Sequence, residues 1–137
     1  MPMSTSKPLG QVKSYRDLVV WQKSKSLAVD IYKLTQSQPF ERHRSLADQI
    51  NRAAVSVPSN IAEGDERGTN KDSLRFLLIS RGSLAELETQ INIAKEIGLI
   101  TASTLDEVAR RIEEVARLIG GTVKMRRARD ENLRQRF

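Results

Sequence analysis

The sequence predicts an all-α protein folded as an antiparallel, up-down-up-down four-helix bundle. Four segments carry apolar residues at steps of three and four, which is the spacing of one face of an α-helix. No segment shows the regular alternation of apolar and polar residues that is typical of a strand. The connections between the four segments are short, and short loops between long helices make neighbouring helices antiparallel.

The predicted core consists mainly of Leu, Ile, Val and Ala, because aromatic residues make up only 4% of the chain. A length of 137 residues suits one domain, since domains most often have roughly 100–150 residues. We expect a flexible N-terminal arm over residues 1–14, the bundle over residues 15–123 and a basic C-terminal tail over residues 124–137.

The composition also indicates the cellular compartment. The chain has no cysteine, which excludes disulfides, thiolate metal sites and cysteine nucleophiles. This fits a reducing environment, and we expect a cytoplasmic location. No run of about 18 apolar residues occurs, so neither a membrane-spanning helix nor a membrane partner is expected.

The first helix is expected from about Asp17 to Gln36. Ser14 and Asp17 have the spacing of a capping box, and Pro39 disfavours helical backbone at the residue before it, which ends the helix. Trp21 is expected in the core, with stacking on a nucleic-acid base as the alternative.

The second helix is expected from about Ser45, which can cap it, to Glu63. Pro58 lies inside this segment and removes one backbone donor, so we expect a kink there, with a loop break as the alternative. The apolar stripe continues in phase on both sides of the proline, which favours a kinked helix. Gly64 is expected to stop the helix.

The third helix is expected from about Lys71 to Ile97, with Asn70 as its cap. Its first turns, residues 74–79, are apolar at five of six positions. Adjacent helix positions point about 100° apart, so these side chains cannot all face one core. We therefore expect self-association at this segment. Gly82 and Ser83 further along predict a close approach of another helix, near Ala53 and Ala54.

The fourth helix is expected to start at a capping box formed by Thr104 and Glu107. Its apolar residues follow steps of three and four, as in a coiled coil. Gly120 and Gly121 weaken the helix late, so it either ends there or bends and continues into the basic tail.

Basic charge is concentrated at the C-terminus. The net charge is +6, and residues 124–137 hold +4 of it, which leaves a nearly neutral body. Such a tail attracts polyanions, whereas a solvated helix end is the alternative interpretation. The predicted nucleic-acid-binding residues are Lys124, Arg126, Arg127, Arg129, Arg134 and Arg136. Phe137 is a second candidate for base stacking, and the secondary basic candidates are Arg42, Arg44, Arg52 and Arg67.

Catalysis is not expected, because the sequence lacks the necessary groups. His43 is the only histidine and is expected in an exposed turn, so neither a typical zinc site nor a His-carboxylate di-iron site is predicted. No glycine-rich phosphate loop occurs. We expect no cofactor and no metal. One polar cluster is expected to form a hydrogen-bonded network beside the carbonyl that Pro58 leaves free, with a ligand pocket as the alternative: Ser59, Asn60, Glu63, Arg81, Glu86 and Glu88.

Three stretches resemble one known family. They are Tyr15–Gln22 (YRDLVVWQ), Gln49–Gly64 (QINRAAVSVPSNIAEG) and Gly82–Gln90 (GSLAELETQ). Together they resemble the four-helix-bundle proteins encoded in intervening sequences of bacterial 23S rRNA genes, over roughly residues 15–99. That family is related in fold to the accessory variability proteins of diversity-generating retroelements, which are basic pentamers that bind nucleic acid and a reverse transcriptase. The resemblance implies a homopentamer without catalytic activity.

Two functional hypotheses follow. The first is a non-catalytic homo-oligomer that binds RNA or DNA through basic surface with little sequence preference. The second is a protein-interaction adaptor, for example for a polymerase or reverse transcriptase, in which the charge serves solubility.

Overall fold

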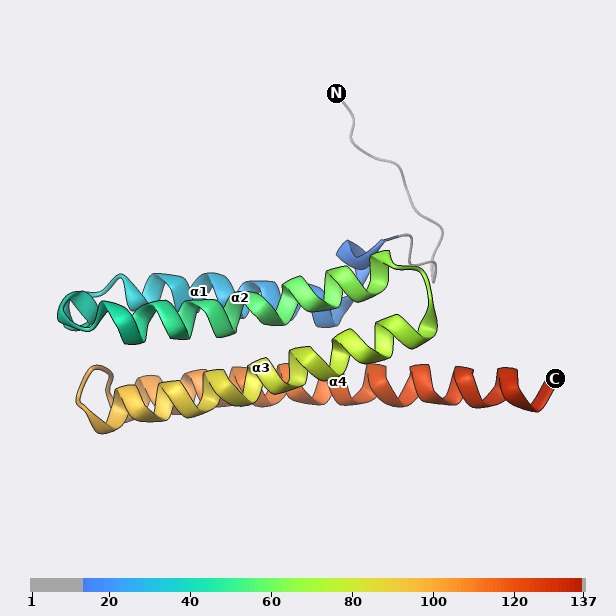
Figure 1. Ribbon diagram of the computed structural model, residues 1–137. Coiled ribbons are helices and arrows are strands. Elements are labelled where there is room, and N and C mark those ends of the chain that lie inside the picture. Colours follow the sequence, from blue (N-terminus) through green and yellow to red (C-terminus); the bar gives the residue numbers. More distant parts are fainter. Residues whose placement is uncertain (1–13, 137) are drawn as a thin grey trace, which may run out of the picture.

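Four long helices, joined in sequence by short turns, make up the described part of the chain. The computed structural model describes residues 14–136, apart from the side chains of Arg134 and Arg136, and contains no strand in this range (Figure 1). The prediction of an all-α four-helix bundle is therefore confirmed. The elements are η1 (Tyr15–Asp17), α1 (Val19–Thr35), η2 (Gln38–Arg42), α2 (Arg44–Glu66), α3 (Asn70–Glu96) and α4 (Ala102–Arg136).

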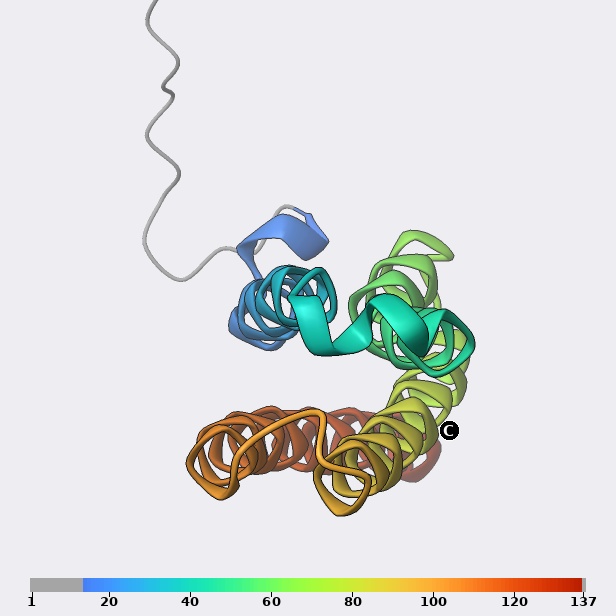
Figure 2. The same cartoon turned by 90° about the vertical axis from the view of Figure 1, so that its left-hand side faces the viewer.

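The helices are arranged as two antiparallel pairs. The pair α1–α2 lies against the pair α3–α4, and the end-on view places α1 beside α2, α2 beside α3 and α3 beside α4 (Figure 2). The α2–α3 contact is the most extensive, and α1 also meets α4. The core is aliphatic, as predicted. Its largest fully buried apolar side chains are Phe40, Ile31, Ile50, Leu87, Ile91, Ile119, Val57 and Val115.

Trp21 lies at the edge of this core. It is half-buried, packs against the core cluster and meets the ring of Tyr15 edge-on, at 5.2 Å between centroids. The helix that carries it begins at Val19, two residues later than expected, because Ser14 accepts a hydrogen bond from the Arg16 N–H and starts the 3₁₀ turn η1 in its place. The prediction that Trp21 lies in the core is therefore met only in part, because its side chain is half-buried.

Gly64 does not end α2, and that prediction was wrong. The helix continues to Glu66, and the chain turns at Gly68, whose φ of 79° is favourable for glycine. A Cβ on Gly64 would lie 2.7 Å from the Cβ of Phe76 and 3.3 Å from the Cα of Ser73. Gly64 therefore permits the close approach of α2 and α3.

The predicted caps of three helices are displaced by one to three residues. His43 occupies the N-cap of α2 in place of Ser45, and Thr69 replaces Asn70 at the start of α3. The hydroxyl of Thr69 accepts a hydrogen bond from the N–H of Asp72 at 3.1 Å. At the start of α4 the hydroxyl of Thr101 accepts from the N–H of Thr104, also at 3.1 Å. Neighbouring Ser, Thr and Asn residues are equivalent candidates in sequence, and the direction of the incoming chain decides between them.

The middle of the α2–α3 contact uses serine hydroxyls. α2 passes through Pro58 as one continuous helix, which excludes the alternative of a loop break. The buried hydroxyl of Ser80 donates to the carbonyl of Val57 at 2.8 Å, and the hydroxyls of Ser56 and Ser83 lie 2.8 Å apart. Gly82 has open space beside it, so the predicted close approach at that glycine is wrong.

The apolar start of α3 is covered largely within the chain. Phe76 and Leu77 are buried, Leu74 and Leu78 pack against the core at intermediate burial, and Ile79 alone is 42% exposed. Packing of this segment between α2 and α4 covers most of its apolar surface. The segment therefore gives little support to self-association, which needs other evidence.

The end of α4 projects beyond the bundle. Of the two alternatives left open for Gly120 and Gly121, continuation is correct, because α4 runs without interruption to Arg136. Its last turns extend past the turn that joins α2 to α3 (Figure 1). Across residues 14–136, no helix offers an apolar stretch long enough to cross a membrane.

Candidate nucleic-acid interface

Three of the six predicted basic residues are exposed near the end of α4. Lys124, Arg127 and Arg129 are exposed, and no ion pair involving them is found among the described residues. They lie on the outward side of the helix, close to the buried Val123 and to Arg126, which contacts the α2–α3 turn. Arg134 and Arg136 lie in the last turns of the same helix, but their side chains are outside the described part, as is Phe137.

Arg126 is placed differently from its neighbours. Its guanidinium lies 3.5 Å from the carboxylate of Asp65 on α2, and the two side chains are only 16% and 23% exposed. Its backbone carbonyl accepts a hydrogen bond from the side chain of Asn70 at 2.7 Å. These contacts fasten α4 to the α2–α3 turn, and Asp65 compensates the charge of Arg126. We call Asp65, Asn70 and Arg126 the α4 clasp.

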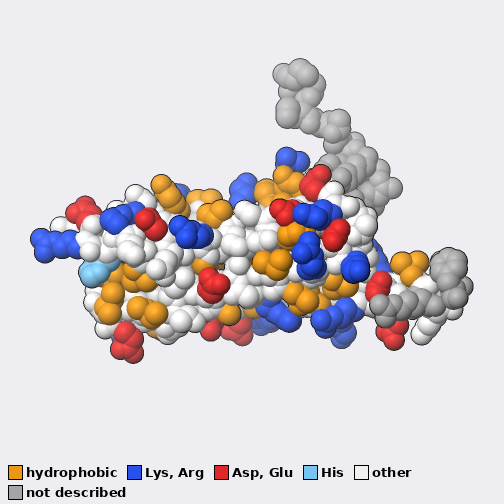
Figure 3. Space-filling model, viewed as in Figure 1, with side chains coloured by type: hydrophobic (Ala, Val, Ile, Leu, Met, Phe, Trp, Pro, Cys, Tyr) orange, Lys and Arg blue, Asp and Glu red, His pale blue; other side chains and the backbone are white. Residues whose placement is uncertain are grey.

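Further basic side chains gather at the same end of the molecule. The space-filling view shows Lys and Arg concentrated on the half where α2 passes into α3, interspersed with acidic residues (Figure 3). Arg67 and Arg75 lie over the ring of Phe76, at 4.8 and 4.6 Å from its centroid, and Arg67 also pairs with Glu63 at 3.5 Å. Sequence reasoning missed Arg75 and Lys71, although their separation of four residues, off the apolar stripe, places them on one helix face.

The other secondary arginines lie elsewhere. Arg44 donates to the carbonyl of Thr35 at 3.0 Å and lies 3.9 Å from Asp48, so it serves the α1–α2 connection. Arg42 and Arg52 are exposed, Arg42 in η2 and Arg52 on α2. Of the secondary set, the structure thus brings only Arg67 to the same end of the molecule as the end of α4.

The predicted polar cluster is divided. Arg81, Glu86 and Glu88 are exposed on α3 and form no described hydrogen bond with Ser59, Asn60 or Glu63. The side chain of Asn60 donates to the carbonyl and the hydroxyl of Ser56, at 2.8 and 2.9 Å. The network therefore centres on Ser56, and not on the Ala54 carbonyl that Pro58 deprives of its partner. Within the described residues no group of three or more His, Asp or Glu side chains is arranged to hold a metal ion.

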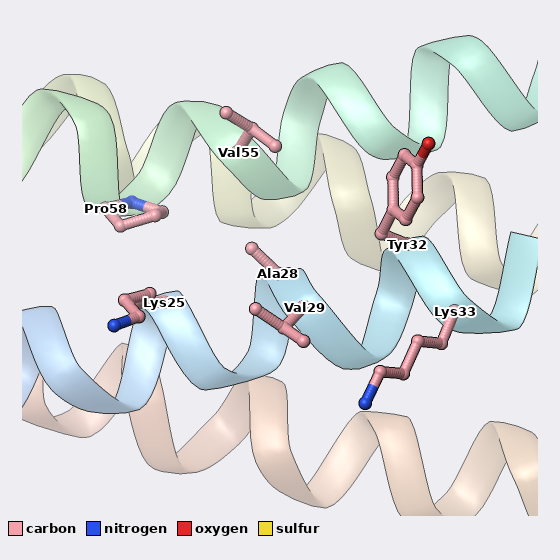
Figure 4. Close-up of a pocket in the computed structure, with 7 residues that line it drawn as sticks. All are labelled: Lys25, Ala28, Val29, Tyr32, Lys33, Val55 and Pro58. Atoms are coloured by element: carbon pink, nitrogen blue, oxygen red, sulfur yellow. The ribbon is translucent and has the colours of Figure 1, made fainter.

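An apolar groove between α1 and α2 is the feature that sequence reasoning did not find. We call it the α1–α2 groove; its volume is about 370 Å³ (Figure 4). It is lined by Lys25, Ala28, Val29, Tyr32, Lys33, Val55 and Pro58. Val29, Tyr32 and Val55 are 44%, 55% and 50% exposed. A signal existed, because these three apolar residues fall outside the core stripes of their own helices.

Comparison with known proteins agrees with this architecture. The family model for the 23S rRNA-intervening sequence protein matches residues 16–121. One solved structure, a protein of unknown function from the S23 ribosomal protein family of Bacteroides thetaiotaomicron, superposes with a TM-score of 0.71. It is 24% identical, and the match covers 77% of this chain and 99% of that one. No match was found among curated proteins.

Proposed function

This chain belongs to the 23S rRNA-intervening sequence protein family, and from that premise we propose that it is a non-catalytic, homo-oligomeric protein that binds RNA or DNA with little sequence preference. The observation that carries the proposal is the C-terminal part of α4, on which Lys124, Arg127 and Arg129 are exposed. The last turns of this helix extend beyond the bundle (Figure 1). The name of the family refers to 23S rRNA, which is itself a polyanion. We propose a pentamer as the assembly, because of the family's relation in fold to pentameric proteins, and the cytoplasm as its location.

The chemistry of the binding surface follows from its composition. Lysine and arginine side chains on a projecting helix neutralise phosphates and release counterions, and that contact carries no sequence information. The exposed carboxylate of Glu131 on the same helix weakens the surface only in part. Lys71 and Arg75, at the neighbouring start of α3, extend the same basic end.

The salt dependence of RNA binding tests the proposal. We expect fluorescence anisotropy with a labelled single-stranded RNA to show log K falling against log salt with a slope of about −2 if three phosphates are neutralised per chain. Between 50 and 200 mM salt this slope corresponds to a loss of roughly 20-fold in affinity. Replacing Lys124, Arg127 and Arg129 together by glutamine should abolish most of that slope.

A matched variant separates local contacts from net charge. Lys71 stays as it is, because it belongs to the basic end. Arg110 and Arg117 on α4 and Arg81 on α3 are exposed and supply the same loss of three charges. Their replacement by glutamine should leave the slope nearly unchanged. An equal loss of slope in both variants would mean that net charge alone causes the effect. If the wild-type protein does not retain RNA at about 150 mM salt, the protein-interaction adaptor is favoured.

A further inference from the structure

Two exposed apolar surfaces of this chain are complementary in charge. One is the α1–α2 groove, whose apolar floor of Val29, Tyr32 and Val55 is bordered by Lys25 and Lys33. The other, which we call the α3 patch, is the exposed face of the second half of α3 together with the residue that caps it, and comprises Glu88, Asn92, Ile93, Glu96 and the C-cap Ile97. Large apolar side chains that stay this exposed on a small bundle mark a surface that another molecule covers.

The α3 patch has an acidic border around an apolar centre. Ile93 and Ile97 are 45% and 51% exposed, and a shallow hollow of about 390 Å³ lies beside Ile93. Glu88 and Glu96 line this hollow on either side, and no ion pair of either carboxylate is found among the described residues. Lys95 is the neighbouring cation and is only partly exposed.

The α1–α2 groove has the opposite border. The ammonium of Lys25 lies 5.0 Å from the centroid of the Trp21 ring, and Lys33 points away from α2 (Figure 4). The acidic residues nearest the groove are engaged elsewhere, because Asp30 pairs with Arg111 on α4 and Glu63 pairs with Arg67. The positive charge of the two lysines is therefore not compensated from within the described part of the chain.

The spacing of the charges also matches. Lys25 and Lys33 are eight residues apart on α1, and Glu88 and Glu96 are eight residues apart on α3. At a rise of about 1.5 Å per residue, both separations are about 12 Å along a helix. Val29 lies midway between the lysines. Asn92 lies midway between the glutamates, and Ile93 follows it about 100° around the helix, at the side of the acidic pair. Two helices laid side by side would bring the two charge pairs together, with Ile93 and Ile97 along one side of that contact.

We propose that the α1–α2 groove of one subunit receives the α3 patch of a second copy of this chain. The inference rests on the homo-oligomer of the proposed function and assigns the surfaces that build it. The groove opens on the α1–α2 pair, with the other two helices behind it, whereas the patch is on α3 (Figures 2 and 4). Because the two surfaces differ, the contact is heterologous, and such contacts close into rings when the rotation between subunits allows.

Charge reversal tests this assignment. We expect Lys25→Glu with Lys33→Glu, and separately Glu88→Lys with Glu96→Lys, to reduce the mass measured by multi-angle light scattering to that of one chain. Mixing the two variants should raise the mass above that of one chain, because each reversed surface now matches a surface of the other variant. Strict alternation cannot close a ring of five, so we expect pairs or even-numbered assemblies in place of the wild-type mass. The control reverses two exposed cations outside both surfaces, Arg81→Glu with Arg110→Glu, and should keep the wild-type mass.

The outcomes are distinguishable. A wild-type protein that is monomeric overturns both the homo-oligomer and this interface. A wild-type oligomer whose mass survives both double reversals overturns the interface alone. If the double lysine reversal lowers RNA affinity while the mass stays unchanged, the groove binds nucleic acid, and this result also overturns the proposed interface. A mass above that of one chain in the mixture excludes misfolding as the cause of dissociation, and circular dichroism checks that each variant stays helical.

Discussion

The α2–α3 contact and the projecting end of α4 use the same kinds of residue for opposite purposes. At the contact, Gly64 and Ser80 are buried and touch the neighbouring helix directly. On α4, Gly120 and Gly121 have open space around them, and the exposed side chains beyond them face solvent. Substitutions should therefore change stability at the contact, whereas on the projecting end they should change binding and leave the fold intact.

Truncation of a leucine should give the largest difference between the two regions. Leu87 on α3 is fully buried, so Leu87→Ala is expected to lower the free energy of unfolding by about 2–5 kcal/mol, through lost burial and the cavity left behind. Leu133 near the end of α4 is 50% exposed, and Leu133→Ala should change the free energy of unfolding by about 0.5 kcal/mol or less. Urea unfolding followed by circular dichroism measures both. Similar losses would show that the end of α4 is packed against something.

Replacement of two glycines by alanine should change the free energy of unfolding in opposite directions. Gly121→Ala is expected to stabilise the protein by up to about 1 kcal/mol, because alanine favours the helix and nothing lies within 4 Å. Gly64→Ala places the same methyl group 2.7 Å from the Cβ of Phe76 and should cost a net of about 1–3 kcal/mol. Thermal unfolding of both variants decides the matter. Stabilisation by both would mean that α2 and α3 separate without cost.

The α4 clasp joins the two regions, and its ion pair should have a smaller effect. A double-mutant cycle with Asp65→Asn and Arg126→Gln is expected to give a coupling of about 1 kcal/mol, because both side chains are largely buried. The matched pair Arg44–Asp48 is 47% and 66% exposed, and its coupling should be about 0.3 kcal/mol. Denaturant titration of the four proteins in each cycle gives these values. A larger coupling for the exposed pair would contradict a structural role for Arg126.

The periodicity of apolar residues was sufficient to predict the four helices but not where each begins and ends. Gly64 was interpreted as a stop because glycine is common after helix ends, yet only the position of Phe76 on another helix reveals its role. The caps failed for a related reason, since Thr69 and Asn70 are both good candidates and tertiary structure selects one of them. Helix ends depend on distant contacts that local sequence does not contain.

The basic tail shows the same limit for the candidate site. Sequence reasoning treated Arg126 and Arg127 alike, although only Arg126 continues the steps of four and three that begin at Ile119 and Val123. That phase directs it toward the bundle, where Asp65 meets it. The α1–α2 groove was missed because its apolar residues come from two helices, and neither helix alone contains the pattern.

The projecting end of α4 has a consequence for a ring of identical subunits. Cyclic symmetry places equivalent parts on the same side of the assembly, so every copy of the basic helix end would meet a long polyanion from one direction. Once one end has bound, the others act at high local concentration, and such avidity exceeds the affinity of a single site by about 10²–10⁴. A few accessible cations per chain are then enough for firm binding, and release requires only that the ring come apart.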